Sequence, residues 1–273
     1  MPGGLLPGPH RPARRRGRRQ PLRVRTTVSD ALYTELLQLA LQAAGRAGEL
    51  LRDGRPADLA VAATKSSPID VVTEMDLAAE KLITDLIADR RPADGILGEE
   101  GASSEGTSGI RWVIDPLDGT VNYLYGLPTW AVSVAAEQDG EPVVAVVTAP
   151  MRDETFHAVR GRGAWATGVW AGERKLACRP APPLDQALVS TGFNYVADVR
   201  AHQAAVAQRL IPLVRDIRRG GSAAVDLCDV AAGRLDGFYE RGPDRPGSGR
   251  RDRWPGKRRR DRWPPRRATL GRT

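Results

Sequence analysis

Apolar and polar side chains recur at helical spacing in two stretches of the first hundred residues. Between residues 29 and 50 an apolar position returns every three or four residues, with Ser29 or Asp30 placed to cap the start and Gly54 after the end. A second stripe of this kind runs from about 75 to 90. The positions of the second stripe that we expect to face inward are Leu77, Leu82, Ile83, Leu86 and Ile87. The sequence therefore predicts two amphipathic helices.

From residue 110 onward the pattern changes to short apolar runs, which favour strands. Residues 130–136 and 143–147 flank Gly140 and predict an antiparallel hairpin, and the run 112–114 precedes an aspartate and a proline. Further predicted elements are strands at 155–159, 188–191 and 235–239 and helices at 202–214 and 222–233. Because strands and helices interleave, we expect an α/β or α+β fold built in layers.

The composition excludes several classes of protein. The chain has 273 residues and only two cysteines, so a disulfide scaffold is excluded, and no His or Cys cluster has zinc-ligand spacing. No apolar run approaches the roughly 20 residues that cross a bilayer. The basic N-terminus has no apolar h-region, so a secretory signal is not expected. The sequence favours a cytoplasmic protein with no membrane association.

The net charge of +8 comes from the two ends of the chain. Residues 1–27 hold eight arginines and no acid, and residues 241–273 hold thirteen basic and three acidic side chains, which leaves 20 basic and 30 acidic side chains for 28–240. The middle of the chain is therefore acidic, and nucleic acid is expected as a partner only through the basic ends. Because 1–27 lacks apolar periodicity, we expect it to be disordered.

Two acidic clusters are the candidates for chemistry. The pair 99–100 follows a short apolar run, and the string Asp-Pro-Leu-Asp-Gly-Thr occupies 115–120. We expect a sharp turn there, because proline fixes one φ angle and glycine allows a positive one. Such a turn would bring Asp115, Asp118 and the carbonyl of Leu117 toward one point. Mg²⁺ takes oxygen ligands of this kind.

A lone Asp-x-x-Asp-Gly string is more often a solvated turn than a metal site. In this chain Asp70 and Asp76 lie upstream together with the acidic pair, which favours the metal. Because neighbouring side chains diverge, we expect one of Glu99 and Glu100 to be a ligand and the other to be solvated or to lie behind it. The side chains for which we expect only packing or surface roles are Trp112, Trp130, His157, His202 and Cys228.

Several blocks of the sequence resemble the inositol monophosphatase family of metal-dependent phosphatases. The most specific is Trp-x-x-Asp-Pro-x-Asp-Gly-Thr-x-Asn at 112–122, which Gly-Glu-Glu at 98–100 precedes. The other matching blocks are Lys-Ser-Ser-Pro-Ile-Asp-Val-Val-Thr-Glu-Met-Asp at 65–76, Gly-Ser-Ala-Ala-Val-Asp-Leu-Cys at 221–228 and Asp-Gly-Phe-Tyr-Glu at 236–240. The resemblance implies that 28–242 form a layered αβαβα sandwich of the inositol monophosphatase and fructose bisphosphatase type.

The resemblance also implies an activity, the Mg²⁺-dependent hydrolysis of inositol monophosphate to myo-inositol and phosphate by an activated water. The metal ligands that it implies are Glu99, Asp115, the carbonyl of Leu117 and Asp118. The catalytic residues that it implies are Glu99 and Thr120, which would position the water, and Asp76, which would orient them. The substrate-binding residues that it implies are Asp118, Gly119, Thr120, Gly221, Ser222, Ala223 and Glu240. A small phosphorylated polyol as substrate and a homodimer are further implications.

Two alternatives to this activity remain open. Related phosphatases that act on fructose bisphosphate, histidinol phosphate or nucleotides share the metal motifs, and a panel of substrates separates them. The alternative from a different class is a non-catalytic protein whose basic ends bind nucleic acid, for which a steep salt dependence of binding is the expected sign.

The chain departs from the family pattern after Gly242. The family continues with a Trp-Asp pair, whose aspartate is the remaining ligand of a second metal, and with a segment that completes the second sheet. Residues 243–273 are instead rich in Arg, Pro, Trp and Gly, and we interpret them as a low-complexity segment that is frameshifted or disordered, or else as an evolved basic tail. We therefore expect the C-terminal part of the second sheet to be missing or replaced, with low solubility and much reduced activity.

Overall fold

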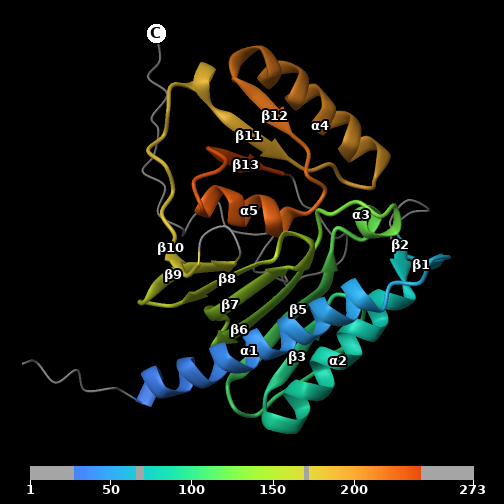
Figure 1. The fold of residues 1–273 in the computed structure, drawn as a ribbon, viewed down its shortest axis with the longest axis vertical. Coiled ribbons are helices and arrows are strands. Elements are labelled where there is room, and N and C mark those ends of the chain that lie inside the picture. The colour runs from blue at the N-terminus through green and yellow to red at the C-terminus, as the bar shows by residue number, and fades with distance from the viewer. Residues whose placement is uncertain (1–27, 66–70, 169–171, 241–273) are drawn as a thin grey trace, which may run out of the picture.

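The computed structural model describes residues 28–65, 71–168 and 172–240, which contain two main sheets, a separate two-stranded sheet and the helices that cover them (Figure 1). The predictions for 1–27, Asp70 and 243–273 lie outside the described residues. Within the described ranges, no helix combines the length and the apolar character needed to cross a membrane.

The larger sheet has eight strands in the order β10-β9-β8-β7-β6-β5-β3-β4. Its strands are β3 (Gly95–Gly98), β4 (Ser103–Ser104), β5 (Ile110–Asp118), β6 (Ala131–Gln138), β7 (Glu141–Ala149), β8 (Glu154–Val159), β9 (Gly163–Gly168) and β10 (Arg174–Lys175). The predicted hairpin is confirmed as β6 and β7, which pair antiparallel across the Asp139–Gly140 turn. β5 pairs with β3 in parallel and with β6 antiparallel, and its last residues carry the aspartates at 115 and 118.

One face of the large sheet is covered by α1 (Val28–Asp53) and α2 (Glu74–Arg90), as both predicted stripes require (Figure 1). Alternate residues of β6 show why the sheet is buried on both sides. Val132 and Val134 pack in the core under the two helices, whereas Ala131 packs with Val225 of α5 (Ala223–Ala231) on the opposite face. A strand with both faces buried reads as an apolar run, which is the pattern of 130–136.

The smaller sheet has three parallel strands in the order β12-β11-β13. These strands are β11 (Leu188–Thr191), β12 (Asp216–Arg218) and β13 (Gly237–Tyr239). α5 lies between the two sheets, and α4 (Ala197–Leu210) lies beside the smaller sheet (Figure 1). The elements left to name are the β1 (Val61–Thr64) and β2 (Val71–Thr73) hairpin, α3 (Thr120–Leu124) and the short turns η1 (Pro150–Arg152), η2 (Leu184–Gln186) and η3 (Ile211–Leu213). The mixed α/β layered architecture is therefore confirmed.

Three details of the sequence-based prediction are wrong. Leu77 does not face inward, since its side chain is 47% exposed and the buried polar side chains of Asp76 and Glu80 take part of the inner face of α2 instead. The helix predicted from 202 begins five residues earlier, at Ala197. β5 does not end before its aspartates but continues through Asp118, because β6 pairs along it with a register irregularity that accommodates the proline.

Candidate active site at the end of β5

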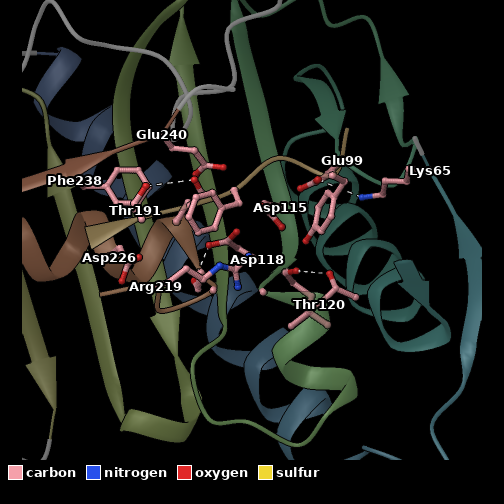
Figure 2. Close-up of a pocket in the computed structure, with 18 residues that line it drawn as sticks. Lys65, Glu99, Asp115, Asp118, Thr120, Thr191, Arg219, Asp226, Phe238 and Glu240 are labelled. Carbon is pink, nitrogen blue, oxygen red and sulfur yellow. Dashed lines mark hydrogen bonds and ion pairs between the residues drawn. The ribbon is translucent and has the colours of Figure 1, made fainter. Parts of the chain in front are cut away.

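One open pocket, with about 670 Å³ of empty space when the adjoining solvent is included, collects the predicted site residues (Figure 2). It lies where the end of β5 and the start of α3 meet the start of α5 and the ends of β11 and β13. The predicted residues that line it are Glu99, Asp115, Leu117, Asp118, Gly119, Thr120, Gly221, Ser222, Ala223 and Glu240. Asp76 is the exception, because it is fully buried beneath Thr120.

The end of β5 supplies the carboxylates of the pocket. Asp115 is 4% exposed and Asp118 is half-buried, and the chain turns only at Gly119. Gly119 has φ +103°, and a Cβ there would lie 3.0 Å from the carbonyl oxygen of Thr129. Glycine is required by both the positive φ and the close backbone, and the turn starts α3 at Thr120. The sharp turn expected within 115–120 is thus confined to Gly119, and the irregular end of β5 before it gathers these groups.

The Thr120 hydroxyl is held from below by Asp76. Thr120 Oγ1 lies 3.0 Å from Asp76 Oδ1 and 3.0 Å from the carbonyl oxygen of Leu117. The other oxygen of Asp76 accepts hydrogen bonds from the backbone N–H and hydroxyl of Thr73, at the start of α2. Burial raises the pKa of Asp76, and the hydrogen bonds from Thr73 oppose that rise. Asp76 therefore fixes the Thr120 hydroxyl at the edge of the pocket.

Glu99 and Glu100 converge on one cation, Lys65. Lys65 Nζ lies 3.2 Å from Glu99 Oε1 and 2.7 Å from Glu100 Oε1. Burial raises the pKa of Glu100 to about 7, although Lys65 lowers it, and the two carboxylates hold the pKa of Lys65 above its usual range. Glu100 is thus the acid that lies behind Glu99, and it is not solvated, since its side chain is 4% exposed.

Asp118 connects the large sheet to the start of α5. Its Oδ2 accepts hydrogen bonds of 2.6 Å from the hydroxyl of Ser222 and 2.6 Å from the backbone N–H of Ala224. Ser222 is also the N-cap of α5, where its hydroxyl oxygen accepts from the N–H of Val225. Backbone N–H groups at a helix start favour an anion, so this position suits the Asp118 carboxylate.

The pocket also contains residues that the sequence analysis did not single out. The additional lining residues are Lys65, Thr191, Gly192, Phe193, Tyr195, Arg219, Asp226 and Phe238. Arg219 precedes the matched block 221–228, and Asp226 is a member of it whose pKa burial raises. Lys65 opens the first matched block, so the signal that could have found Lys65 and Asp226 was present in the sequence.

Asn122 of α3 ties the loop before α5 to the segment before β6. Its side-chain N–H groups donate to the carbonyl oxygen of Thr129 at 2.6 Å and to that of Gly220 at 2.8 Å. Asn122 is 6% exposed. The final Asn of the block 112–122 therefore fixes the loop that carries Gly221 and Ser222, a role that spacing alone did not reveal.

The candidate packing residues lie outside the pocket. Trp112 is fully buried and donates to Asp94 at 2.8 Å, and Trp130 is 3% exposed. His157 lies in the middle of β8, where burial lowers its pKa. Cys228 is half-buried in α5. Neither His157 nor His202 lines the pocket, so neither is given a role in it.

The donor set agrees in kind with a hard cation. Glu99, Asp115 and Asp118 offer carboxylate oxygens and Leu117 a carbonyl oxygen, which are the ligands that Mg²⁺ takes. Among the residues that the structure describes, no three acidic, histidine or cysteine side chains come together in metal-binding geometry. Two of these carboxylates have other partners in the structure, since Lys65 pairs with Glu99 and the hydroxyl of Ser222 donates to Asp118. The residues fit the metal by chemistry, and its binding would exchange these contacts for the ion.

The layered α/β fold, with a pocket of oxygen donors between its two main sheets, agrees with the phosphatase family that the motifs indicated. Residues 32–251 match the model of the inositol monophosphatase family. The chain belongs to this family, as its motifs indicated.

Relatives and solved structures agree with that assignment. The chain is 42% identical over 229 residues to inositol-1-monophosphatase SuhB of Mycobacterium tuberculosis, which covers 82% of this chain and 77% of that protein. It is 46% identical over 181 residues to inositol-1-monophosphatase of Mycobacterium leprae, but the match spans 64% of this chain and only 62% of that protein. The solved structure of Mycobacterium tuberculosis SuhB is similar with a TM-score of 0.65 at 40% identity, over 77% of this chain and 78% of that one.

Two further solved structures are similar. One is the SuhB protein of Bartonella henselae, with a TM-score of 0.69 at 36% identity over 76% of this chain and 79% of that one. The other is the inositol monophosphatase of Thermotoga maritima, with a TM-score of 0.66 at 32% identity over 76% of each chain.

Nus factor SuhB of Escherichia coli is also a relative, 42% identical over 209 residues, or 76% of each chain.

Proposed function

We propose that this chain is a Mg²⁺-dependent phosphomonoesterase that hydrolyses inositol monophosphate to myo-inositol and phosphate, with an activity that its departure from the family pattern after residue 242 reduces. The observation that carries the proposal is the convergence of three carboxylates, one backbone carbonyl and a hydroxyl on one pocket. The family assignment supports a phosphatase, and the relatives named inositol-1-monophosphatase support the substrate.

Glu99, Asp115 and the carbonyl of Leu117 would hold one Mg²⁺, and Asp115 and Asp118 would share a second. When bound, Mg²⁺ lowers the pKa of a water and neutralises charge on the phosphate during an in-line displacement. Asp115 is the residue common to both proposed Mg²⁺ positions, and its side chain is nearly buried at the end of β5. Its substitution is therefore expected to have the largest effect.

The chain's own residues orient the attacking water. The Thr120 hydroxyl is fixed at 3.0 Å from Asp76 Oδ1, so its oxygen can accept a hydrogen bond from a water in the pocket while its proton stays on the Asp76 side. Glu99 lines the same pocket, and its carboxylate would accept a hydrogen bond from the second proton of that water. The pair directs the water oxygen toward phosphorus, so that no covalent phospho-enzyme is needed.

Backbone and side-chain donors of the pocket hold the substrate. The backbone N–H groups of Gly119 and Thr120 would hold the phosphate, as the family resemblance implies, and both residues line the pocket. Gly221, Ser222 and Ala223 line the opposite wall, and Glu240 offers a carboxylate to the hydroxyl groups of a polyol. A small phosphorylated polyol therefore suits the pocket better than an apolar ester.

The test is phosphate release from a panel of phosphomonoesters by the purified chain, measured with and without Mg²⁺. We expect inositol monophosphate to be preferred over fructose bisphosphate, histidinol phosphate and nucleotides. Asp115→Asn is expected to lower kcat/KM by about 100-fold or more, since even residues that only support a ligand cost about 10- to 100-fold. Asp85→Asn is the control, because Asp85 is exposed on α2 and pairs with Lys81. Equal activity of both variants would refute the proposed site.

A second candidate function is non-catalytic. The relative in Escherichia coli carries the name Nus factor SuhB, which does not describe a phosphatase. Under this candidate the chain binds a macromolecule, and its basic ends bind nucleic acid. A steep salt dependence of RNA or DNA binding, lost on deletion of 241–273, would support it, together with the absence of any Mg²⁺-dependent phosphate release.

We also infer that the protein forms a homodimer, as the family resemblance implies. The measurement is the molar mass of the purified chain by light scattering after size-exclusion chromatography. A mass near twice 29.5 kDa is expected, and a mass near 29.5 kDa would contradict the inference.

A further inference from the structure

Glu80 is a buried acid to which neither the motifs nor the proposed chemistry gives a role. It lies on α2 one helical turn after Asp76 and is 6% exposed. Its carboxylate accepts two backbone hydrogen bonds, from the N–H of Glu100 to Oε2 and from the N–H of Ala102 to Oε1, both 2.9 Å. Burying a carboxylate is costly unless such donors compensate its charge. The loop that follows β3 supplies them.

The loop is shaped around this carboxylate. A Cβ on Gly98 would lie 2.2 Å from Glu80 Oε2, so a larger residue there would force the Glu80 carboxylate out of this position. The loop is closed on itself, because the N–H of Gly98 donates to the carbonyl oxygen of Ala102 at 2.6 Å. The backbone of 98–102 therefore wraps the end of the Glu80 side chain.

This loop carries Glu99, the ligand that comes from outside β5. The backbone N–H of Glu99 donates to the carbonyl oxygen of Ile114 at 3.0 Å, one residue before Asp115. The next N–H in the chain, that of Glu100, is the one that Glu80 holds. The backbone of Glu99 is thus fixed between β5 on one side and Glu80 on the other, which sets where its carboxylate lies in the pocket that it shares with Asp115.

α2 therefore supports both the 115–120 segment and the loop of Glu99, through two acids that lie four residues apart. Asp76 holds the hydroxyl of Thr120 in the 115–120 segment, and Glu80 holds the loop of Glu99. Residues four apart lie on one face of a helix, so both carboxylates point the same way.

We propose that Glu80 is a positioning residue for the metal site: by fixing the 98–102 backbone, it sets the position of Glu99 and hence the affinity for Mg²⁺. This inference rests on the proposed Mg²⁺-dependent function. Glu80 touches neither substrate nor the reacting atoms, so it acts through the loop alone.

The test is Glu80→Gln in the full chain, with Glu74→Gln as the matched control on the exposed side of the same helix. A glutamine can accept one of the two N–H groups, but its own N–H₂ then faces the other donor. We expect the dissociation constant of Mg²⁺, measured by calorimetry without substrate, to rise by about 10- to 100-fold. We expect kcat at saturating Mg²⁺ to change by less than about threefold, and Glu74→Gln to match the wild type.

Amide hydrogen exchange gives a readout independent of metal and activity. The amides of Glu100 and Ala102 are expected to exchange faster in Glu80→Gln than in the wild type, while those of the β6–β7 pairing are unchanged. Glu80→Asp keeps the charge but shortens the side chain, and it is expected to give the same changes if Glu80→Gln does not fold.

The outcomes separate the two claims. Wild-type chain that binds no Mg²⁺ would overturn the proposed function. Wild-type chain that binds Mg²⁺, with unchanged affinity and unchanged exchange at Glu100 and Ala102 in the folded variant, would overturn the role of Glu80 alone.

Discussion

At the scale of single residues, the site depends on polar groups that the surrounding backbone holds in one orientation. Thr120 is the clearest case, because its hydroxyl has acceptors on two sides, Asp76 and the carbonyl of Leu117. Burial raises the pKa of Asp76, and three donated hydrogen bonds oppose that rise without cancelling it. The position of one hydroxyl is therefore set by α2 and β5 together.

Removing that hydroxyl tests its role in orienting water. We expect Thr120→Ala to lower kcat by about 100-fold or more, within the range for a group that assists proton transfer. Thr120→Ser keeps the hydroxyl and is expected to retain most of the activity. The measurement is kcat at saturating Mg²⁺ and inositol monophosphate. Serine and alanine variants with the same loss would contradict a role of the hydroxyl.

The two cysteines are expected to differ in reactivity. Burial raises the pKa of the Cys228 thiol, and the neighbouring Asp229 raises it further, whereas Cys178 is exposed. The thiolate is the reactive form, so at pH 8 the Cys228 thiol stays protonated and unreactive. Iodoacetamide followed by mass spectrometry should modify Cys178 many times faster in the folded chain. Equal rates at both cysteines would contradict the burial of the Cys228 thiol against the elements that pack on α5.

At the scale of elements, α5 holds the two sheets together at both of its ends. Its start bonds to Asp118 of β5, as described above. In its last turn, Asp229 forms an ion network with Arg152, Arg234 and, from β8, Glu154. Glu154 is 5% exposed, so the network is mostly shielded from water. The placement of Ser222 in the pocket thus depends on contacts at the far end of its helix.

Breaking the network should cost stability. We expect Glu154→Gln to lower the free energy of unfolding by about 1–3 kcal/mol, because both arginines lose a charged, buried partner. Lys81→Gln is the control, since Lys81 and Asp85 form an exposed pair worth about 0–1 kcal/mol. Urea unfolding followed by tryptophan fluorescence measures both. A loss for Glu154→Gln no larger than for Lys81→Gln would contradict the role of the network.

The elements also show what the sequence could and could not predict. The stripes and apolar runs were sufficient to find α1, α2 and the β6–β7 hairpin, because periodicity reflects burial directly. The path of β5 through Asp115 and Asp118 was missed, since pairing with β6 across an irregular register is a tertiary effect. Glu80 was missed for the same reason: its partners are backbone N–H groups about twenty residues away, which leave no side-chain pattern.

At the scale of the whole molecule, the pocket exists because two sheets meet around α5 (Figure 1). The large sheet supplies the proposed metal ligands, and the smaller sheet with α5 supplies Arg219, Ser222 and Glu240 on the substrate side (Figure 2). Motifs that are a hundred residues apart in the sequence therefore face one another. Their order in the chain identified the family, and the fold explains why each is needed.

The most direct test of this account is the release of phosphate from inositol monophosphate by the purified 273-residue chain as Mg²⁺ is titrated. We expect release that depends on Mg²⁺, stops when EDTA removes the ion, and is lost in Asp115→Asn but not in Asp85→Asn. Release that persists in EDTA or in Asp115→Asn would contradict the account, as would the failure of the folded chain to hydrolyse any phosphomonoester at saturating Mg²⁺.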